Sequence, residues 1–405
     1  MRDRGHKVTI ATSEIYRAKI EGEGLRFRPL RPDFNFVLED PDIIRRAFHP
    51  RTGGAYILRK LLIPWIEQSY EDTLAAARDA DFLVGHAITF ATRTVAEVLQ
   101  KPWMSVALQP SIFLSAYDPS SIPGAPFLDR LHPLGPRFWG PAYRLIRHAA
   151  RRWGRPLNAL RGKAGLLPLN NALLDGMFSP TGTQAWFSKV LAEPQPDWQP
   201  RTTVTGFPFY DKLEPGQCLT PELERFLADG PAPVVFTLGS AAVMDAGEFY
   251  AESLLAVRRL GCRAVMLIGR DARNLPVGPV PDTVHFAEYA PYSELLSRAA
   301  AVVHQGGVGT TAQSLRAGKP MLVVPMSHDQ PDNGRRIAKL GVGAVIPRSK
   351  YRAESAAAAL QQLTAAQSYR DAATRIAQVI ASEDGVSAAC DGLEAALQAV
   401  TKSGA

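Results

Sequence analysis

The residues with the clearest chemical potential lie at 304–311, where the chain reads HQGGVGTT. An apolar run ends there in His304, and a helix-like pattern follows the glycines and threonines. Small residues between a strand and a helix let a ligand approach the backbone, and the free N–H groups of the first helical turn attract phosphate. The imidazole of His304 can also donate to a phosphate oxygen. The stretch predicts a phosphate-binding turn, against the alternative of a tight strand–helix connection without a ligand.

The same loop contains a nominal dinucleotide-binding pattern, G-x-G-x-x-A at Gly307, Gly309 and Ala312, with Asp329 further along the chain. An NAD-dependent oxidoreductase is therefore one alternative function. That pattern should open the first strand–helix–strand unit of its domain, but several strand-like segments precede it here. The acidic residue should end the next strand, but Asp329 follows Pro325 in a loop. We interpret the match as coincidental.

Two further segments indicate a nucleotide site. FTLGS is a second strand that ends in a turn, at Gly239 and Ser240, and EYAPY places Tyr289 just before the strand of the glycine-rich loop. Backbone turns of this kind form concavities that bind anions, and polar groups in special environments gather at binding sites. The two turns together favour a ligand role for His304.

The elements that position these turns alternate between strand and helix in both halves of the chain. Segments such as DFLVGHA, PVVFTLGS, RAVMLIG and PMLVVP are apolar without alternation, and amphipathic segments such as 246–260 lie between them. Parallel sheets covered on both faces have this pattern. We therefore expect an α/β protein of two doubly wound domains, at 1–205 and 215–380, with a helical tail at 381–405. The boundary is expected in the proline-rich segment 193–222.

The composition is that of a globular protein with more than one core. Of the 405 residues, 46% are hydrophobic and 21% are charged, which excludes a disordered chain. No apolar run approaches the ~18 residues of a membrane span, and the N-terminus lacks the apolar core of a signal peptide. Cys218, Cys262 and Cys390 lie far apart and have no metal-type spacing. We expect a cytoplasmic protein without a metal site.

The net charge of +7 is concentrated in one segment. Between Asp129 and Asp175 there is no acidic residue, while arginines recur, and in 143–155 the arginines lie opposite an apolar helical face. One interpretation is a solvated face on a core-packed helix. The other is peripheral contact with the anionic inner face of a membrane. Nucleic acid is not an expected partner, because no binding motif accompanies the charge.

The run from His304 to Thr311, followed by Gly318-Lys319-Pro320 and by Asp329-Gln330-Pro331-Asp332-Asn333, resembles the donor-binding signature of bacterial UDP-glycosyltransferases. The similarity is to the branch that glycosylates sterols and macrolides of the erythromycin type. GHKVTIATS, PWMSVALQPS and TGFPFYDK are similar to the N-terminal domain of that branch, so the resemblance covers most of the chain. It implies the GT-B fold, in which two Rossmann-like domains face a cleft. The domain at 1–205 would bind the acceptor and the domain at 215–380 the nucleotide-sugar.

The resemblance also implies a role for each matching residue. Tyr289 would lie against the uracil, and the backbone of Ala290 would read its edge. Asp329 and Gln330 would bind the sugar hydroxyls. The glutamate that often binds the ribose is matched by Gln313, which can still hydrogen-bond a hydroxyl group but without the charge. The diphosphate would be held by Gly239, Ser240, His304 and the amides of Val308, Gly309 and Thr310, while Gly306 and Gly307 allow its approach.

These roles imply an inverting transferase that moves a hexose from a UDP-hexose donor to a hydroxyl group. A helix N-terminus and His304 can stabilise the leaving UDP without a metal, and no DxD-type acidic cluster follows a strand. We therefore expect metal independence and no cofactor beyond the UDP-sugar co-substrate. The acceptor is expected to be apolar, of sterol, lipid, macrolide or polyphenol type. Aromatic residues are frequent around the expected cavity: Phe113, Tyr117, Phe127, Phe138, Trp139 and Tyr143.

The base that deprotonates the acceptor is not assigned by any motif. In this family the first strand, glycine-rich loop and helix carry it, whereas Met1 falls just before RDRGHKVTI, which is similar to the end of that helix and the second strand. We expect a shortened chain that lacks this unit, is poorly active and aggregates. His86, at a strand end, is the remaining candidate base, with a structural role as its alternative. A sugar-nucleotide-binding protein with weak catalysis is the other alternative function.

Overall fold

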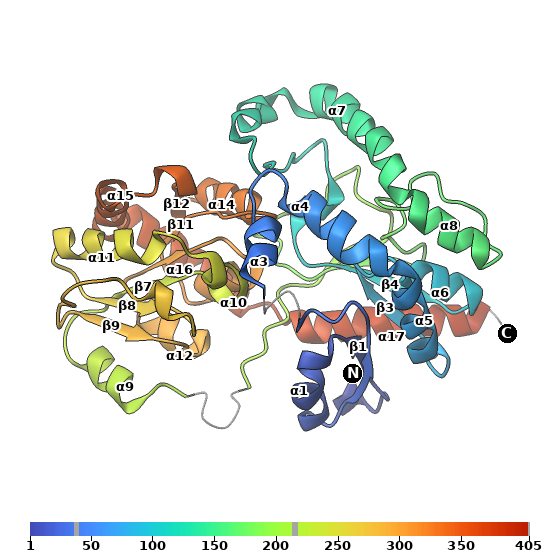
Figure 1. Ribbon diagram of the computed structural model, residues 1–405, viewed down its shortest axis with the longest axis horizontal. Helices are drawn as coiled ribbons and strands as arrows, with labels where there is room; N and C mark the ends of the chain where they lie inside the picture. The colour runs from blue at the N-terminus through green and yellow to red at the C-terminus, as the bar shows by residue number, and fades with distance from the viewer. Residues whose placement is uncertain (36–39, 213–217, 404–405) are drawn as a thin grey trace.

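The computed structural model describes residues 1–35, 40–212 and 218–403. Two α/β halves lie side by side along the longest axis of the molecule (Figure 1). All the strand pairings among these residues are parallel, as the apolar, non-alternating strand sequences predicted.

The second half is built on a six-stranded sheet in the order β12-β11-β10-β7-β8-β9. Strands β7, β8, β10 and β11 are buried along their whole length because helices cover both faces. The strands are β7 (Val234–Thr237), β8 (Ala264–Leu267), β9 (Val284–Ala287), β10 (Ala301–His304), β11 (Met321–Val323) and β12 (Gly343–Val345).

Two groups of helices cover this sheet. Helices α11 (Phe249–Leu260) and α15 (Ala353–Ala365) pack on one face around a core that includes Phe236 and Met266. The helix expected at 246–260 begins only at Phe249, because Gly247 takes a φ of 54° and ends the preceding turn. The remaining helices are α9 (Pro221–Ala228), α10 (Gly239–Ala242), α12 (Tyr292–Leu295), α13 (Val308–Arg316), α14 (Gln330–Lys339) and α16 (Gln367–Ala381).

The first half contains two separate sheets. Strand β1 (Thr9–Thr12) pairs with β2 (Arg26–Pro29), and the second sheet has the order β3-β4-β5-β6. Its strands are β3 (Leu83–His86), β4 (Trp103–Ala107), β5 (Thr183–Ala185) and β6 (Thr202–Val204). Among the described residues no pairing connects β1 with β3, so each of these strands keeps one edge unpaired. The parallel strands expected for this half are present, divided between two sheets.

The helices of the first half are distributed over both sheets. They are α1 (Arg17–Gly22), α3 (Pro41–Ala47), α4 (Gly53–Tyr56), α5 (Ile66–Ala77), α6 (Thr92–Val98), α7 (Gly135–Ala150) and α8 (Arg155–Lys163). Helix α1 packs on β2, α5 contacts β1 and β2, and α6 packs on β3. Helix α7 forms the upper edge of the molecule in Figure 1. Before α7 the chain runs through short 3-10 turns, where Phe113 stacks on Trp198 with ring centroids 4.1 Å apart.

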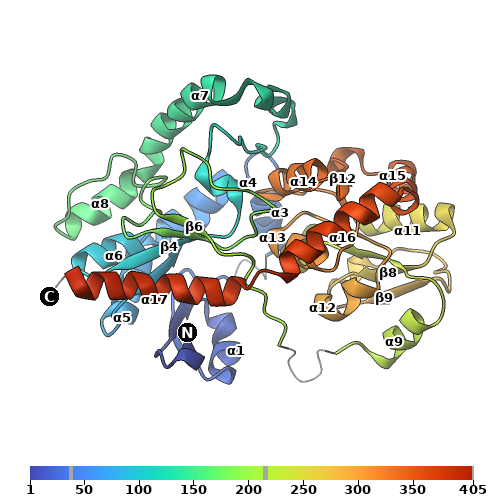
Figure 2. The same ribbon diagram turned by 180° about the vertical axis from the view of Figure 1, so that it is seen from behind.

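The C-terminal helix α17 (Gly385–Ser403) returns to the first half (Figure 2). Gln184 Nε2 donates to the carbonyl of Ala389 at 2.9 Å, and His6 Nε2 lies 2.8 Å from Glu394 Oε1. The expected helical tail is therefore packed against the N-terminal half. Residues 404 and 405 at its end lie outside the described residues, as do 213–217, which include the expected domain start at 215.

The two places where the chain crosses between the halves contact one another. A Cβ on Gly385 would lie 2.5 Å from the carbonyl oxygen of Phe207, so only glycine fits there without a shift of the backbone. Gly206 has a φ of 99°, and a Cβ there would likewise come close to Gly385 and Glu383. The crossing after β6 and the crossing before α17 thus form one junction.

Candidate active site

The structure brings the two glycine turns to the same edge of the six-stranded sheet. β10 lies between β7 and β11, and its pairing places His304 level with Thr237 on one side and with Val323 on the other. The carboxyl ends of these three strands therefore open at one edge. Ligands of parallel α/β sheets bind at such an edge.

His304 is a neutral hydrogen-bond donor at this edge. Its side chain is fully buried, and burial lowers its pKa to about 3, so the ring is uncharged at neutral pH. The backbone N–H of Gly306 donates to its Nδ1 at 3.1 Å, which places the ring proton on Nε2. Nε2 has no hydrogen-bond partner in the described part of the chain.

Gly306 is required by the packing of the turn itself. It has a φ of 88°, and a Cβ there would lie 2.8 Å from Val323 Cγ1 and 2.9 Å from the carbonyl oxygen of Gln330. Glycine is the residue that tolerates both conditions. The glycine-rich turn is therefore packed directly against the start of α14.

The other three glycines of the site differ in what surrounds them. A Cβ on Gly239 would lie 2.5 Å from Gln305 Nε2, and one on Gly307 would lie 2.8 Å from the same atom. The Gln305 amide thus contacts both turns. A Cβ on Gly309 would meet nothing within 4 Å, so this glycine leaves open space at the first turn of α13, where the free N–H groups of Val308, Gly309 and Thr310 lie.

A set of buried polar atoms around the turn is without a partner among the residues that the structure describes. Buried polar groups in proteins are nearly always hydrogen-bonded, so such a set marks a place where a polar ligand binds. The sequence predicted a ligand role for His304 and a hydroxyl donor at Thr311. Gln305 and Asn333 lie within the predicted donor-binding signature, whereas Ser327 was not singled out. The atoms are His304 Nε2, Gln305 Oε1, Thr311 Oγ1, Ser327 Oγ and Asn333 Oδ1.

Asp329 and Gln330 lie beside this turn, at the start of α14. Asn333 Nδ2 donates to Asp329 Oδ2 at 2.7 Å and to the carbonyl of Gly306 at 2.8 Å, which ties the carboxylate to the glycine-rich turn. Burial raises the pKa of Asp329. Gln330 points its amide oxygen inward, where it accepts from the backbone N–H groups of Met326 and Ser327 at 2.8 and 3.0 Å.

The other residues predicted to bind the sugar-nucleotide donor are arranged around the same edge of the six-stranded sheet. Tyr289 is 57% exposed and its ring is accessible, whereas Ala290 beside it is buried. Ser240 is exposed at the start of α10. Gln313 Oε1 accepts from Arg316 Nη2 at 2.8 Å, so its oxygen is already engaged. Tyr292, which the sequence did not single out, contacts the end of β7, with its hydroxyl 2.8 Å from Thr237 Oγ1.

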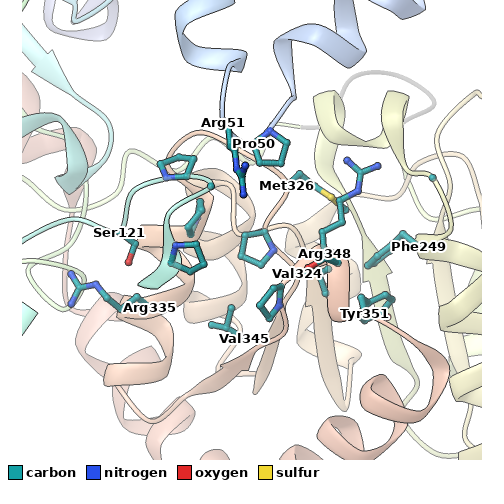
Figure 3. A pocket seen from close by; sticks show the side chains of 18 of the residues that line it. Pro50, Arg51, Ser121, Phe249, Val324, Met326, Arg335, Val345, Arg348 and Tyr351 are labelled. Atoms are coloured by element: carbon teal, nitrogen blue, oxygen red, sulfur yellow. The ribbon is translucent and has the colours of Figure 1, made fainter. Parts of the chain in front are cut away.

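A cavity of about 860 Å³ lies between the two halves, next to this edge. Pro50 and Arg51 reach into it from the segment before α4, opposite Val324 and Val345 of the second half (Figure 3). Met326 and Pro331 connect it to the segment that contains Asp329. The other lining residues are Ser121, Ile122, Pro123, Gly124, Pro126, Asp129, Ala246, Gly247, Glu248, Phe249, Pro325, Arg335, Pro347, Arg348, Ser349, Tyr351 and Arg352.

The aromatic residues expected around an acceptor cavity do not line this one. Phe113, Trp139 and Tyr143 are core residues with at most 4% exposure: Phe113 packs in a core shared by both halves, and Trp139 and Tyr143 pack in a small core before and within α7. Tyr117, Phe127 and Phe138 are at least 40% exposed and lie outside the cavity lining. Prolines and aliphatic residues make up about half of the lining, and Arg51, Arg335, Arg348 and Arg352 are among the rest.

His86 ends β3 in the first half and is not among the residues that line the cavity. Burial lowers its pKa, and its Nε2 has no partner among the described residues. Within the same residues, no group of three His, Cys, Asp or Glu side chains is placed to hold a metal ion. No helix over residues 1–35, 40–212 or 218–403 combines the length and apolarity needed to cross a membrane.

Comparison with known proteins gives consistent matches. Residues 253–392 match the family described as erythromycin biosynthesis protein CIII-like, C-terminal domain. The chain is 33% identical to O-mycaminosyltylonolide 6-deoxyallosyltransferase of Streptomyces fradiae, an alignment that covers 96% of this chain and 90% of that relative. It is 27% identical to a sterol 3-beta-glucosyltransferase of Glomerella lagenarium, over 95% of this chain but 26% of the longer relative.

The fold is found in solved structures as well. The crystal structure of the glycosyltransferase VinC in complex with dTDP is similar with a TM-score of 0.67, at 21% identity, over 98% of this chain and 94% of that chain. The predicted GT-B fold is confirmed by this similarity. The chain belongs to the family of UDP-glycosyltransferases that includes the macrolide glycosyltransferases and the sterol glucosyltransferases.

Proposed function

We propose that this protein transfers a hexose from a UDP-sugar to a hydroxyl group of an apolar acceptor, with inversion and without a metal ion. The observation that carries the proposal is the Nε2–H of the fully buried His304, which, like several polar atoms near the start of α13, has no partner among the residues that the structure describes. A buried donor without a partner costs about 1–3 kcal/mol, so its retention beside a helix N-terminus is best explained by an anionic ligand.

The diphosphate of the donor would lie across the two glycine turns. His304 Nε2 and the amides of Val308, Gly309 and Thr310 donate to its oxygens, with the turn at Gly239 and Ser240 on the other side. As the bond to the sugar breaks, negative charge develops on the leaving diphosphate. The N–H groups of α13 and His304 stabilise that charge in place, which is the role that a metal ion has in other transferases.

The nucleoside and the sugar would extend in opposite directions from the diphosphate. Tyr289, accessible beyond β9, lies against the base, and Asp329 binds the sugar hydroxyls. Gln330 is better described as a support, because its amide oxygen holds the turn at Met326 and Ser327. Gln313 does not supply the charge of a glutamate at the ribose, and VinC was solved with dTDP. Both UDP and dTDP therefore belong in any donor test.

The acceptor would bind in the 860 Å³ cavity. Its size is within the range of cavities that hold one small molecule, and its proline, valine, methionine and phenylalanine walls suit an apolar body. Because Met326 and Pro331 border it, an acceptor hydroxyl in the cavity lies near the segment that would hold the sugar.

Calorimetry with UDP, dTDP and NAD, followed by mass spectrometry of transfer reactions with sterol, macrolide, lipid and polyphenol acceptors, tests the proposal. We expect binding of UDP or dTDP, no binding of NAD, and a product heavier by one hexose. Binding of NAD alone would favour the oxidoreductase. Nucleotide binding with no transfer to any acceptor would favour a sugar-nucleotide-binding protein.

We also propose that the protein works in the cytoplasm and contacts the inner face of an anionic membrane through α7. Arg144 and Arg147 of α7 and Arg151, in the 3-10 turn that follows the helix, line a small cavity of about 270 Å³, and Leu145 of α7 is 70% exposed. An apolar acceptor partitions into such a membrane, so this contact would bring enzyme and acceptor together.

A further inference from the structure

His328, the residue before Asp329, holds a backbone conformation that residues with a side chain rarely adopt. Its φ is 57°, in the left-handed region, where Cβ comes too close to the backbone. Glycine would fit there without that strain. Strained conformations persist where surrounding contacts fix them, and they gather at functional sites. The side chain of His328 therefore needs a role that glycine could not fill.

The His328 ring lies against a residue of the other half. Its centroid is 5.4 Å from that of Phe48, at the end of α3, and the two rings meet edge to face at 71°. Burial lowers the pKa of His328, so the ring is neutral and packs as an aromatic group. Phe48 also packs against the hydrophobic core of the second half, which includes Met326. The first half therefore contacts the second directly beside Asp329.

Phe48 belongs to a compact helical hairpin, residues 41–56, formed by α3 and α4. The backbone N–H of Gly53 donates to the carbonyl of His49 at 2.8 Å. A Cβ on Gly53 would collide with the carbonyl oxygen of Ala47, so the start of α4 packs directly on the end of α3. The hairpin is thus one rigid piece around Phe48.

The same hairpin forms a wall of the cavity between the halves. Pro50 and Arg51, which lie between α3 and α4, line the cavity opposite Met326 of the second half (Figure 3). An acceptor in this cavity would touch the hairpin that contains Phe48. Because the hairpin is compact, the position of its cavity wall and the position of the Phe48 ring are set together.

Resting on the proposed function, we propose that Phe48 is a positioning residue of the transfer, which acts through His328 on the carboxylate of Asp329. Asn333 holds that carboxylate from the side of α14, with its Nδ2 2.7 Å from Asp329 Oδ2. The Phe48 ring fixes the chain on the other side, one residue before Asp329. The half that forms the acceptor wall thereby sets the direction of the carboxylate that would bind the sugar.

Phe48→Leu tests this assignment, because leucine keeps an apolar side chain but removes the ring that meets His328. We expect kcat for transfer from UDP-hexose to fall about 10- to 100-fold, since a displacement of about 1 Å at a positioning group has an effect of this size. The dissociation constant of UDP, measured by calorimetry, should stay within about twofold. Phe48→Tyr keeps the ring and should retain the wild-type kcat. An unchanged kcat in Phe48→Leu, or an equal loss in Phe48→Tyr, would overturn the proposal.

His328→Asn removes the other ring of the contact and keeps the backbone, because asparagine tolerates the left-handed conformation well. If Phe48 acts through His328, the two replacements remove the same contact and their effects are not additive. The double variant, Phe48→Leu with His328→Asn, should then lose no more kcat than the more impaired single variant. Losses that multiply in the double variant would mean that Phe48 does not act through His328.

The chain offers a matched control in a second phenylalanine–histidine pair. Phe226 and His285 lie within the second half, with their ring centroids also 5.4 Å apart. Phe226→Leu should keep its kcat, and a loss equal to that of Phe48→Leu would make the effect one of general packing and overturn the proposal. Wild-type protein that binds UDP or dTDP but transfers no hexose would instead overturn the proposed function itself.

Discussion

His304 presents its ring proton on Nε2, which has no partner in the described part of the chain, while Nδ1 accepts from the backbone of its own turn. This arrangement makes the donor independent of pH over the physiological range, because the neutral form is the one that burial maintains. A charged histidine would attract phosphate more strongly but would cost far more to bury. The fold therefore holds His304 as a neutral hydrogen-bond donor whose Nε2–H points in one fixed direction.

His304→Ala should weaken the binding of UDP by about 1.5–3 kcal/mol, the usual value of a hydrogen bond to a charged group, which corresponds to roughly 10- to 150-fold in the dissociation constant. Isothermal calorimetry measures this directly. His86→Ala removes a half-buried histidine at another strand end and should leave UDP binding unchanged. An unchanged affinity in His304→Ala would make His304 a structural residue.

Buried neutral histidines should also make the protein sensitive to acid. Burial lowers the pKa values of His304, His86 and His328, so between pH 6.5 and the lower folded-state values the unfolded chain binds protons that the native protein does not. The free energy of unfolding therefore falls as the pH decreases below about 6.5, by up to about 1.4 kcal/mol per pH unit for each such histidine.

Urea unfolding of wild type and His304→Asn at pH 7 and pH 5 isolates one histidine. The asparagine oxygen can still accept from Gly306, so the variant should lose roughly 2 kcal/mol less than wild type between these pH values. The burial of Asp329 raises its pKa and acts in the opposite direction, but equally in both proteins. Parallel losses in the two proteins would contradict the prediction.

Asp329→Ala should distinguish binding of the sugar from binding of the nucleotide. The carboxylate is held by Asn333 at the start of α14, beyond the turn that would bind the diphosphate. We expect transfer from UDP-hexose to fall while the calorimetric affinity for UDP stays nearly intact. Losses of similar size in both measurements would place the carboxylate at the nucleotide.

At the scale of the element, helix α7 is the one whose exposed surface most suggests a binding partner. Arg147 pairs with Asp175 at 2.7 Å, whereas Arg144 of α7 and Arg151, in the 3-10 turn that follows it, line the same small cavity. Leu145 is exposed beside them. Like charges along one helix side repel one another, so an anionic surface would relieve that repulsion.

Replacing Arg144 and Arg151 by glutamate should reduce binding to phosphatidylserine vesicles in a flotation assay. Each cation near such a surface contributes about 1 kcal/mol, and added salt should weaken the wild-type binding. The double replacement Lys350→Glu and Arg375→Glu, on other exposed sites, is the control for net charge. If the wild-type protein floats equally with anionic and neutral vesicles, the proposed contact with an anionic membrane is wrong.

Elements of the second half could be predicted closely from sequence because their signals are local. An apolar strand followed by Gly239 or by the 306–309 glycines marks a strand–turn–helix unit wherever it occurs. The division of the first half into two sheets and the return of α17 depend on contacts between distant residues, such as Gln184 with Ala389, which no periodicity records. The prediction of the cavity lining was wrong for the same reason. Phe113 and Trp139 are apolar enough to lie in a core or to line a cavity, and only the packing of the folded chain decides between the two.

At the scale of the whole molecule, the two halves are held together by a buried group of charges. Asp332 and Arg336 of α14 are 0% and 4% exposed, and Arg336 reaches across to Asp118 of the first half. Arg335 pairs with the same two carboxylates at 3.3 Å. Removing one charge leaves its partners buried and unpaired, which is costly.

Asp332→Ala should therefore lower the free energy of unfolding by about 3–5 kcal/mol, measured by chemical denaturation. Glu222→Ala removes a partner from the exposed pair with Arg225 and should change the stability by less than about 1 kcal/mol. Asp332→Leu combined with Arg336→Leu should recover part of the loss, since no unpaired charge of that pair remains. Equal effects of Asp332→Ala and Glu222→Ala would mean that the group of charges adds no stability.

The junction at Gly206 and Gly385 limits the motion of the two halves in mechanical terms. Two segments that connect the halves at separate places would resist rotation of one half against the other. Because the segments at Gly206 and Gly385 touch, they act as one hinge with a single short axis. Sliding or twisting of one half along the other would pull the Phe207 carbonyl against Gly385, but opening about that axis would not. The motion that the junction leaves free is the parting of the cavity walls, and it has to separate Arg336 from Asp118, so the buried charges hold the cavity closed.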